Sequence, residues 1–223
     1  MTAKSPEWVN LMLDLDPVIP AAIEKQTRRA RKIAITRTQQ LGQPDAHAVR
    51  VASLAAETAW RLGLGHDDIE TVVEGALLHD LGKARVPRAI LDQCRPLTRA
   101  EYVTVMQHPV WGAELVKGHV SERALLVVRH HHERFDGTGY PDRLKGEEIP
   151  LGARIIHVAD ALDSMLTTRI YRAARPAAEA LGELRRAAGT QFCPRCVGAL
   201  ERILPLESLA SDADRPQIAA VAS

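Results

Sequence analysis

Hydrophobic positions recur at spacings of three and four residues along most of the chain, which is the period of an amphipathic α-helix. In the segment His47–Leu64 the apolar positions are Val51, Leu54, Ala55, Ala59 and Leu62. Gly63 and Gly65 follow and are expected to end this helix. A second helix is predicted over Asp67–Asp80, with acidic residues in its first turn, where the helix dipole favours them, and Gly82 is expected to stop it.

The remaining pattern is also helical. Thr98 and Glu101 have the spacing of a capping box, in which Thr98 caps a helix and Glu101 reaches back to it. Further helices are predicted over Pro109–Lys117, Glu122–His132, Ala153–Thr167 and Pro176–Ala188. Alternating strand patterns are essentially absent, so we expect an all-α fold, built as a single helical bundle.

Composition narrows the class of protein. A hydrophobic share of 46% in 223 residues is typical of a soluble domain with a sizeable core. No run approaches the roughly 20 apolar residues of a membrane span, and the acidic residues near the start do not suit a signal peptide. The prediction is a soluble, cytoplasmic protein without a membrane partner. The net charge of +1 gives no reason to expect a nucleic-acid duplex as partner.

Cysteine use agrees with a reducing compartment, because the chain has only Cys94, Cys193 and Cys196. Cys193 and Cys196 form a C-P-R-C pair, but a structural zinc site usually needs four ligands, and no second pair is present. We interpret them as ordinary thiols, with a zinc or redox role as the weaker alternative.

Histidine and aspartate gather at apolar helical positions. His79 and Asp80 end the apolar run ALLHD, where burying them is costly unless a charge meets them. Comparable positions are occupied by His47, His108, the triplet His130–His132 and Asp160. Each alone reads as a structural or surface residue, but together they are what a helical bundle uses to build a two-metal site. Lys83, one turn after His79, is placed to meet an anionic phosphate oxygen.

Short motifs follow one another in a distinctive order: His47, HDLGK at 79–83, HP at 108–109, HHE at 131–133 and DGTGYP at 136–141. Together with the segment 149–172 they resemble the HD-GYP domains, which are bacterial signalling phosphodiesterases that degrade the second messenger cyclic di-GMP. The resemblance covers about residues 43 to 204. It implies a bundle of the HD-domain type over residues 41–205, between a short N-terminal helical segment (1–40) and a flexible tail (206–223).

The resemblance also implies a metal-dependent hydrolase. Two divalent transition metals would be held by His47, His79, Asp80, His108, His131, His132 and Asp160, with Asp80 as the bridging ligand. A metal-bridging hydroxide would attack the phosphodiester in line. Iron or manganese is favoured, and zinc, nickel and cobalt are compatible with the same donors. Asp80 and Lys83 are the expected catalytic residues.

Substrate contacts are expected from residues around this set. By the same resemblance Lys83 would neutralise one phosphate, while Arg169 and Arg172 would grip the other phosphate or a guanine edge. Asp163 is expected to contact the ligand or to orient a water. The alternative for Arg169 and Arg172 is a basic pair that complements a helix C-terminus.

The chain departs from the family pattern at a few positions. Gln43 stands where family members with a third metal have an acid, so two metals and the linear product pGpG are expected. The usual K-P-G reads Asp-Gln-Cys-Arg-Pro at 92–96, and the usual F-D-P reads Phe-Cys-Pro at 192–194. Neither change touches the expected metal ligands.

Other functions and partners remain open at this stage. The chain is alternatively a cyclic di-GMP receptor with little turnover, or an HD-type phosphohydrolase of a nucleoside triphosphate or an alarmone. The loop at Tyr140 and Pro141 is a candidate surface for a GGDEF-type diguanylate cyclase. The N-terminal segment, too short for a sensor domain, is a candidate dimerising helix, which would make the protein a homodimer.

Overall fold

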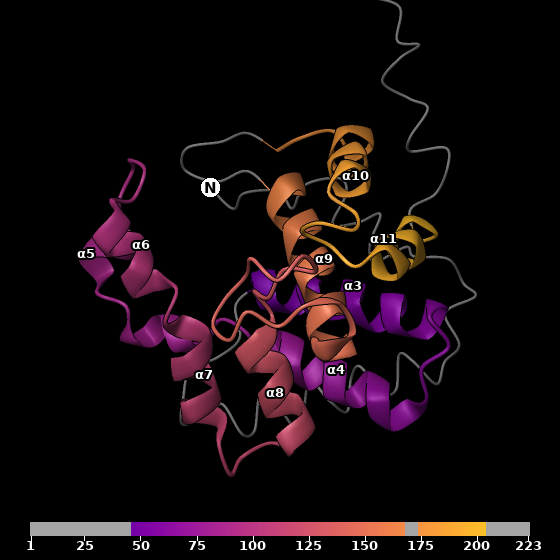
Figure 1. Cartoon of the computed structure of the whole chain (residues 1–223), viewed down its shortest axis with the longest axis horizontal. Helices are drawn as coiled ribbons and strands as arrows, with labels where there is room; N and C mark the ends of the chain where they lie inside the picture. The colour runs from indigo at the N-terminus through magenta and orange to yellow at the C-terminus, as the bar shows by residue number, and fades with distance from the viewer. Residues whose placement is uncertain (1–45, 168–173, 204–223) are drawn as a thin grey trace, which may run out of the picture.

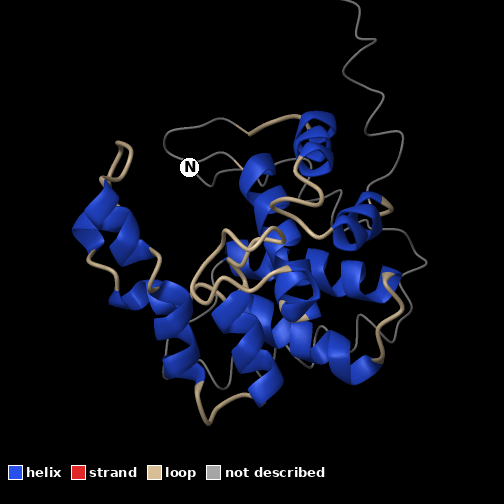
Figure 2. Ribbon diagram, viewed as in Figure 1, coloured by secondary structure: helices blue, strands red, loops and turns tan. Residues whose placement is uncertain are grey.

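The computed structural model describes residues 46–167 and 174–203. The expected end segments 1–40 and 206–223 lie outside these residues, as do Gln43, Arg169 and Arg172. Within the described ranges every regular element is a helix, and strand pairing is limited to one isolated bridge between Ala188 and Phe192 (Figures 1 and 2). The prediction of an all-α fold is therefore confirmed.

The helices run in the order α3 (Ala46–Arg61), α4 (His66–Leu78), η1 (Leu81–Arg85), α5 (Arg88–Leu91), α6 (Arg99–Val105), α7 (His108–Val116), α8 (Glu122–His130), η2 (Gly146–Glu148), α9 (Leu151–Leu166), α10 (Ala177–Arg186) and α11 (Pro194–Glu201). In Figure 1, α5 and α6 stand away from the body at the far left, while α9 passes through its middle. None of the described helices combines the length and the apolar character that a bilayer span requires.

The core forms where α9 packs on α3, α4, α10 and α11. Helix α9 is apolar on several sides, with Ile155, Ile156 and Leu162 fully buried, as expected of a central helix. Helix α3 contributes Ala55 and Ala59, both also fully buried. Alanine at these positions lets the neighbouring backbones approach closely, so α3 and α4 run side by side and bring their functional ends together.

The sequence pattern predicted where α3 and α4 end, and the structure agrees with the prediction for α3 but not for α4. Helix α3 ends before Gly63, which has a left-handed φ of 80°, in agreement with the expectation. Helix α4 instead ends at Leu78, and Gly82 lies inside the 3₁₀ turn η1, so the expectation that Gly82 stops α4 is wrong. A Cβ on Gly82 would collide with the carbonyl oxygen of His108 and the amide of Gly112. Glycine is needed there because the start of α7 packs directly on η1, which places His108 beside Asp80.

The capping box is confirmed at the start of α6. The Thr98 hydroxyl accepts a hydrogen bond from the Glu101 amide at 3.3 Å, and the Glu101 carboxylate accepts one from the Thr98 amide at 2.7 Å. The sequence reading missed four elements: η1, α5, η2 and α11. All four are short, and periodicity needs several turns to stand out.

Candidate metal centre

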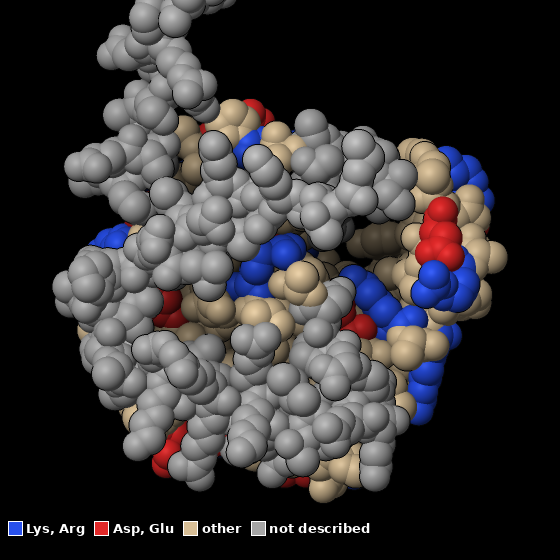
Figure 3. Space-filling view, turned by 180° about the vertical axis from the view of Figure 1, so that it is seen from behind, with Lys and Arg blue, Asp and Glu red and all other residues tan. Residues whose placement is uncertain are grey.

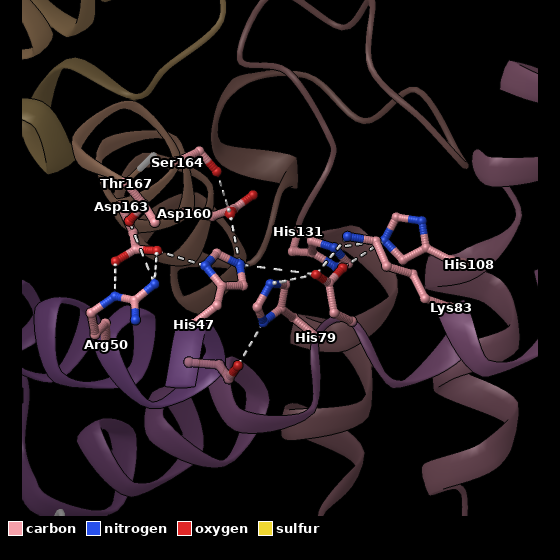
Figure 4. A network of polar contacts seen from close by, with 12 residues as sticks. His47, Arg50, His79, Lys83, His108, His131, Asp160, Asp163, Ser164 and Thr167 are labelled. Atoms are coloured by element: carbon pink, nitrogen blue, oxygen red, sulfur yellow. Dashed lines mark hydrogen bonds and ion pairs between the residues drawn. The ribbon is translucent and has the colours of Figure 1, made fainter. Parts of the chain in front are cut away.

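The expected metal ligands come from several helices, most of them from helix ends, and Figure 4 shows His47, His79, His108, His131 and Asp160 around one space. They are His47 near the start of α3, His79 and Asp80 after the end of α4, His108 at the start of α7, His131 and His132 after α8, and Asp160 on α9. Residues far apart in the chain thus face one space. This arrangement is what the sequence analysis expected of a two-metal site.

Asp80 joins two groups of potential ligands. In one group its carboxylate lies with His108, His131 and His132, and in the other with His47 and His79; within each group the donor atoms are within 4.8 Å of one another. The two carboxylate oxygens face different groups. Oδ1 is 3.3 Å from Nε2 of His108, whereas Oδ2 is 3.5 Å from Nε2 of His79. A carboxylate shared in this way is suited to bridging two cations.

Asp160 extends the group around His47. One of its carboxylate oxygens lies 3.2 Å from Nε2 of His47, and the same nitrogen is 3.9 Å from Asp80. Of the residues expected to hold metals, all seven therefore meet at this site in the described structure.

Backbone carbonyls fix the orientation of three imidazoles. Nδ1 of His79 donates to the carbonyl of Ala76 at 2.6 Å, and the corresponding bonds of His108 to Val105 and of His131 to Val128 are 2.8 and 2.7 Å. Because a carbonyl can only accept, Nδ1 must carry the proton in each ring. In the neutral ring Nε2 then keeps its lone pair, which is the arrangement found in histidines that bind metals.

Several potential ligand atoms of the site lie close together, and some of them have no hydrogen-bond partner, as expected where a cation binds. Nε2 of His108 and Nε2 of His131 are 3.2 Å apart, close enough for both to bind one cation through their lone pairs when the rings are neutral. Nε2 of His79 and Oδ1 of Asp80 are buried without a hydrogen bond, whereas buried polar atoms are almost always bonded. Nitrogen and oxygen donors of this kind suit divalent iron, manganese or zinc, so the residues present fit the expected metals.

Local electrostatics keep the ligands in their binding forms. Burial, followed by the neighbouring His132, lowers the pKa of His131 well below its usual value. Burial and the charge of His108 lower the pKa of His132 to about 3, so both rings are neutral at pH 7. For Asp80 burial raises the pKa, but His79, Lys83 and His108 outweigh burial, and the carboxylate is ionised. Metal binding requires these protonation states.

The pKa of His47 is shifted in the opposite direction to those of His131 and His132. Burial alone would lower the pKa of His47. The hydrogen bonds to Asp160 and Asp163 and the charges of these residues outweigh burial and raise the pKa to about 9. Without a metal His47 is therefore protonated at neutral pH, and a metal must displace that proton to bind Nε2.

Asp163 supports His47 from behind. Its carboxylate accepts a 2.7 Å hydrogen bond from Nδ1 of His47 and bonds of 2.5 and 3.0 Å from the Arg50 guanidinium. Asp163 is fully buried and points toward α3 (Figure 4). In this structure it therefore contacts His47, an expected metal ligand, and does not face the open side of the site. The sequence analysis did not single out Arg50, although its position one turn after His47 places it on the same helix face.

Lys83 stands at the open side. Its ammonium lies 2.6 Å from Oδ2 of Asp80, and its side chain keeps 40% of its surface exposed. Arg169 and Arg172 fall outside the described residues, so their expected contacts stay predictions.

The loop that follows α8 packs against His132. Tyr140 is half-buried, and its ring is stacked on that of His132, with 5.0 Å between the ring centroids and 29° between the ring planes. Its amide donates to the carbonyl of His132 at 3.3 Å. Glu133, which is buried and was not singled out as a site residue from the sequence, accepts a 2.7 Å hydrogen bond from the amide of Asp142. His130 lies outside both ligand groups, since its Nε2 is 2.9 Å from the Asp142 carboxylate.

Cys193 and Cys196 lie at the start of α11, both buried, while Cys94 is exposed. Hydrogen bonding from Cys196 lowers the pKa of the Cys193 thiol to about 5, and the Arg154 guanidinium lies 3.8 Å from its sulfur. Neither a zinc nor a redox role follows from these contacts, so the reading as ordinary thiols stays a prediction.

The described residues form a helical fold with a carboxylate shared by two groups of potential metal ligands, and comparison with known proteins shows which family has this arrangement. The HD domain family matches residues 22–195, and the chain belongs to that family. It is 38% identical over 183 residues to the cyclic di-GMP phosphodiesterase response regulator RpfG of Xanthomonas campestris pv. campestris, covering 80% of this chain and 48% of that protein.

Two further relatives agree. The chain is 37% identical over 161 residues to the 3′3′-cGAMP-specific phosphodiesterase 3 of Vibrio cholerae serotype O1, covering 72% of this chain and 35% of that protein. Among solved structures, Bd1817, an HDG"Y"P protein from Bdellovibrio bacteriovorus, matches 70% of this chain and 51% of its own with 26% identity and a TM-score of 0.59. The resemblance to HD-GYP domains is thereby confirmed. The chain spans about half or less of the curated relatives it matches.

Proposed function

We propose that the protein is a metal-dependent phosphodiesterase that hydrolyses cyclic di-GMP, mainly to linear pGpG. The observation that carries the proposal is the Asp80 carboxylate, each oxygen of which faces a separate group of ligands. The names of the relatives as cyclic di-GMP and cGAMP phosphodiesterases support the substrate class.

The residues of the chain have distinct tasks in this reaction. Asp80, five histidines and Asp160 would hold two divalent ions, iron or manganese by preference. Bound there, the ions would activate a water as hydroxide and neutralise charge on the phosphodiester.

Lys83 lies where the phosphate of the substrate would approach, and its ammonium would neutralise part of the negative charge of that phosphate. Asp163 and Arg50 hold the ring of His47 so that Nε2 points to the site. A ligand fixed before substrate arrives reduces the reorganisation that the reaction needs.

The test is turnover of anaerobically purified protein loaded with Fe²⁺ or Mn²⁺. Cyclic di-GMP, 3′3′-cGAMP, a nucleoside triphosphate and an alarmone are offered separately, and the products are separated by chromatography. We expect pGpG to accumulate from cyclic di-GMP. Binding of cyclic di-GMP without turnover would favour the receptor alternative, and cleavage of the triphosphate or the alarmone alone would favour a different phosphohydrolase.

A contact between the GYP loop and a GGDEF-type diguanylate cyclase is a further part of the proposal. The ring of Tyr140 is stacked on that of His132, so replacing Tyr140 would also disturb the site. Thr138 is exposed on the same loop, which makes Thr138→Arg the better variant for a pull-down. Homodimerisation through residues 1–40 concerns a segment outside the described residues, and a sizing experiment on the full chain tests it.

A further inference from the structure

An open cavity of about 460 Å³ lies beside the metal centre, against the lobe formed by α5, α6 and the loop between them (residues 88–105). Its apolar lining consists of Ile90, Leu91, Pro96, Leu97 and Val105. Figure 3, which shows the molecule from behind, has a hollow beside this lobe at the right, with basic and acidic side chains at its rim. The volume falls within the roughly 300–1,000 Å³ of small-molecule sites, which are mostly apolar with a few polar groups.

The cavity shares walls with the metal centre. Lys83 lines the cavity, and its ammonium is 2.6 Å from the carboxylate of Asp80. Val105 lines it too, and its carbonyl accepts the hydrogen bond from Nδ1 of His108. A ligand whose phosphate sits at Asp80 therefore has the cavity directly beside it, where an attached nucleoside can enter.

The polar lining contains an arginine held in a fixed orientation. Nη1 and Nη2 of Arg95 donate to the two carboxylate oxygens of Glu101 at 2.9 and 2.8 Å, and Nη1 also donates to the carbonyl of Pro96 at 2.9 Å. Glu101 is itself fixed by its capping bond to Thr98. An arginine side chain has five donor hydrogens. Among the described contacts, Nε–H and one hydrogen of Nη2 are left, next to each other on one edge of the guanidinium.

Two adjacent donors of this kind match one purine and not the other. Guanine presents two acceptors, O6 and N7, side by side, whereas adenine carries an amino donor in place of O6. The apolar side chains of the cavity suit the flat faces of a base. The apolar lining and the two donors of Arg95 therefore fit the same ligand, a guanine.

We propose that this cavity is a nucleobase subsite and that Arg95 reads the O6 and N7 edge of a guanine bound there. The inference rests on the proposed phosphodiesterase function. It adds a source of base specificity in the lobe at residues 88–105, outside the metal ligands and Lys83.

The first test compares Arg95→Met with the unchanged protein. The steady-state kcat/KM is measured for cyclic di-GMP, for cyclic di-AMP and for bis(4-nitrophenyl) phosphate, which has no base. A good bidentate contact is worth about 1–3 kcal/mol of discrimination, which is about a 5- to 150-fold change. We expect a loss of this size for cyclic di-GMP, a smaller change for cyclic di-AMP, and no change for the nitrophenyl ester.

A matched control lies on the same lobe. Arg88 is highly exposed, bonds Asp92 at 3.2 Å and does not line the cavity, so Arg88→Met should leave all three rates unchanged. Equal losses in Arg95→Met for the base-containing and base-free substrates would overturn the inference, as would retention of full activity toward cyclic di-GMP. If the unchanged protein cleaves only the nitrophenyl ester, the proposed function fails, and the following measurement still decides on the subsite.

The second test uses Cys94, which lines the cavity and is the exposed cysteine of the chain. Iodoacetamide alkylation of the metal-loaded protein is followed by intact mass, with GMP or AMP present at equal concentrations. The inference predicts that GMP slows alkylation of Cys94 more than AMP does, and that Arg95→Met removes the difference. Equal protection by the two nucleotides, or none by either, would refute guanine recognition in this cavity.

Discussion

The proton on His47 makes metal binding depend on pH in a range where histidine ligands normally do not. An ordinary imidazole has a pKa near 6.5 and competes little with a metal above pH 7. The pKa of His47 is raised to about 9 in the metal-free protein by Asp160 and Asp163. Between pH 9 and pH 7 each pH unit should weaken one metal site tenfold. The total is about 100-fold, or ~2.7 kcal/mol.

The assay is competition for Mn²⁺ against a chelator of known pH dependence, measured between pH 6.5 and 9.5. The affinity of the weaker site should rise with pH, with a slope near one, and level off above pH 9. His47→Ala should retain binding at the group of His108, His131 and His132 but lose this slope. A pH-independent affinity in the unchanged protein, or the same slope in His47→Ala, would refute the role assigned to His47.

Two other substitutions test the supports of the site. In Asp163→Asn one oxygen becomes a donor and a bond to the Arg50 guanidinium is lost, so metal affinity should fall about 10- to 100-fold. Asp142→Asn is the matched control, because Asp142 also joins an arginine to a histidine but lies outside the ligand groups, and it should leave affinity unchanged. In Gly82→Ala the new methyl meets the backbone of α7, which should cost about 1–3 kcal/mol or more and lower Tm in thermal unfolding. Gly198→Ala, with open space at its Cβ on α11, should be neutral or stabilising by up to about 1 kcal/mol; equal Tm values for the two alanine variants would contradict the packing argument.

The sequence predicted the helical class correctly, and the residues that it proposed as metal ligands lie together in the structure. Long helices such as α3 and α9 carry enough turns for their period to be recognised. The candidate ligands could be singled out because burying His and Asp at apolar positions is costly, and because their order resembles that of a known family. The sequence did not show which of these residues contact one another. The contact between His108 and His131, for example, depends on how α7 and α8 pack.

The missed features depend on contacts between distant parts of the chain. Gly82 looked like a helix stop, but its small size serves the close approach of α7. Asp163 was expected to contact the ligand or to orient a water. In the structure its carboxylate contacts Arg50 and His47, which precede it by more than a hundred residues, and the sequence did not indicate these contacts. The period of α9 gives each side chain a direction around the helix, but not the identity of the neighbour it meets.

The proposed function depends most on Asp80, which would hold both metal ions. Elemental analysis of anaerobically purified, Mn²⁺-loaded protein, with turnover of cyclic di-GMP measured on the same samples, tests it most directly. We expect two ions per chain in the unchanged protein, and in Asp80→Ala one ion or none and no turnover, while Asp92→Ala, an exposed acid on the outer lobe, keeps both. Two ions per chain and normal turnover in Asp80→Ala would contradict the claim.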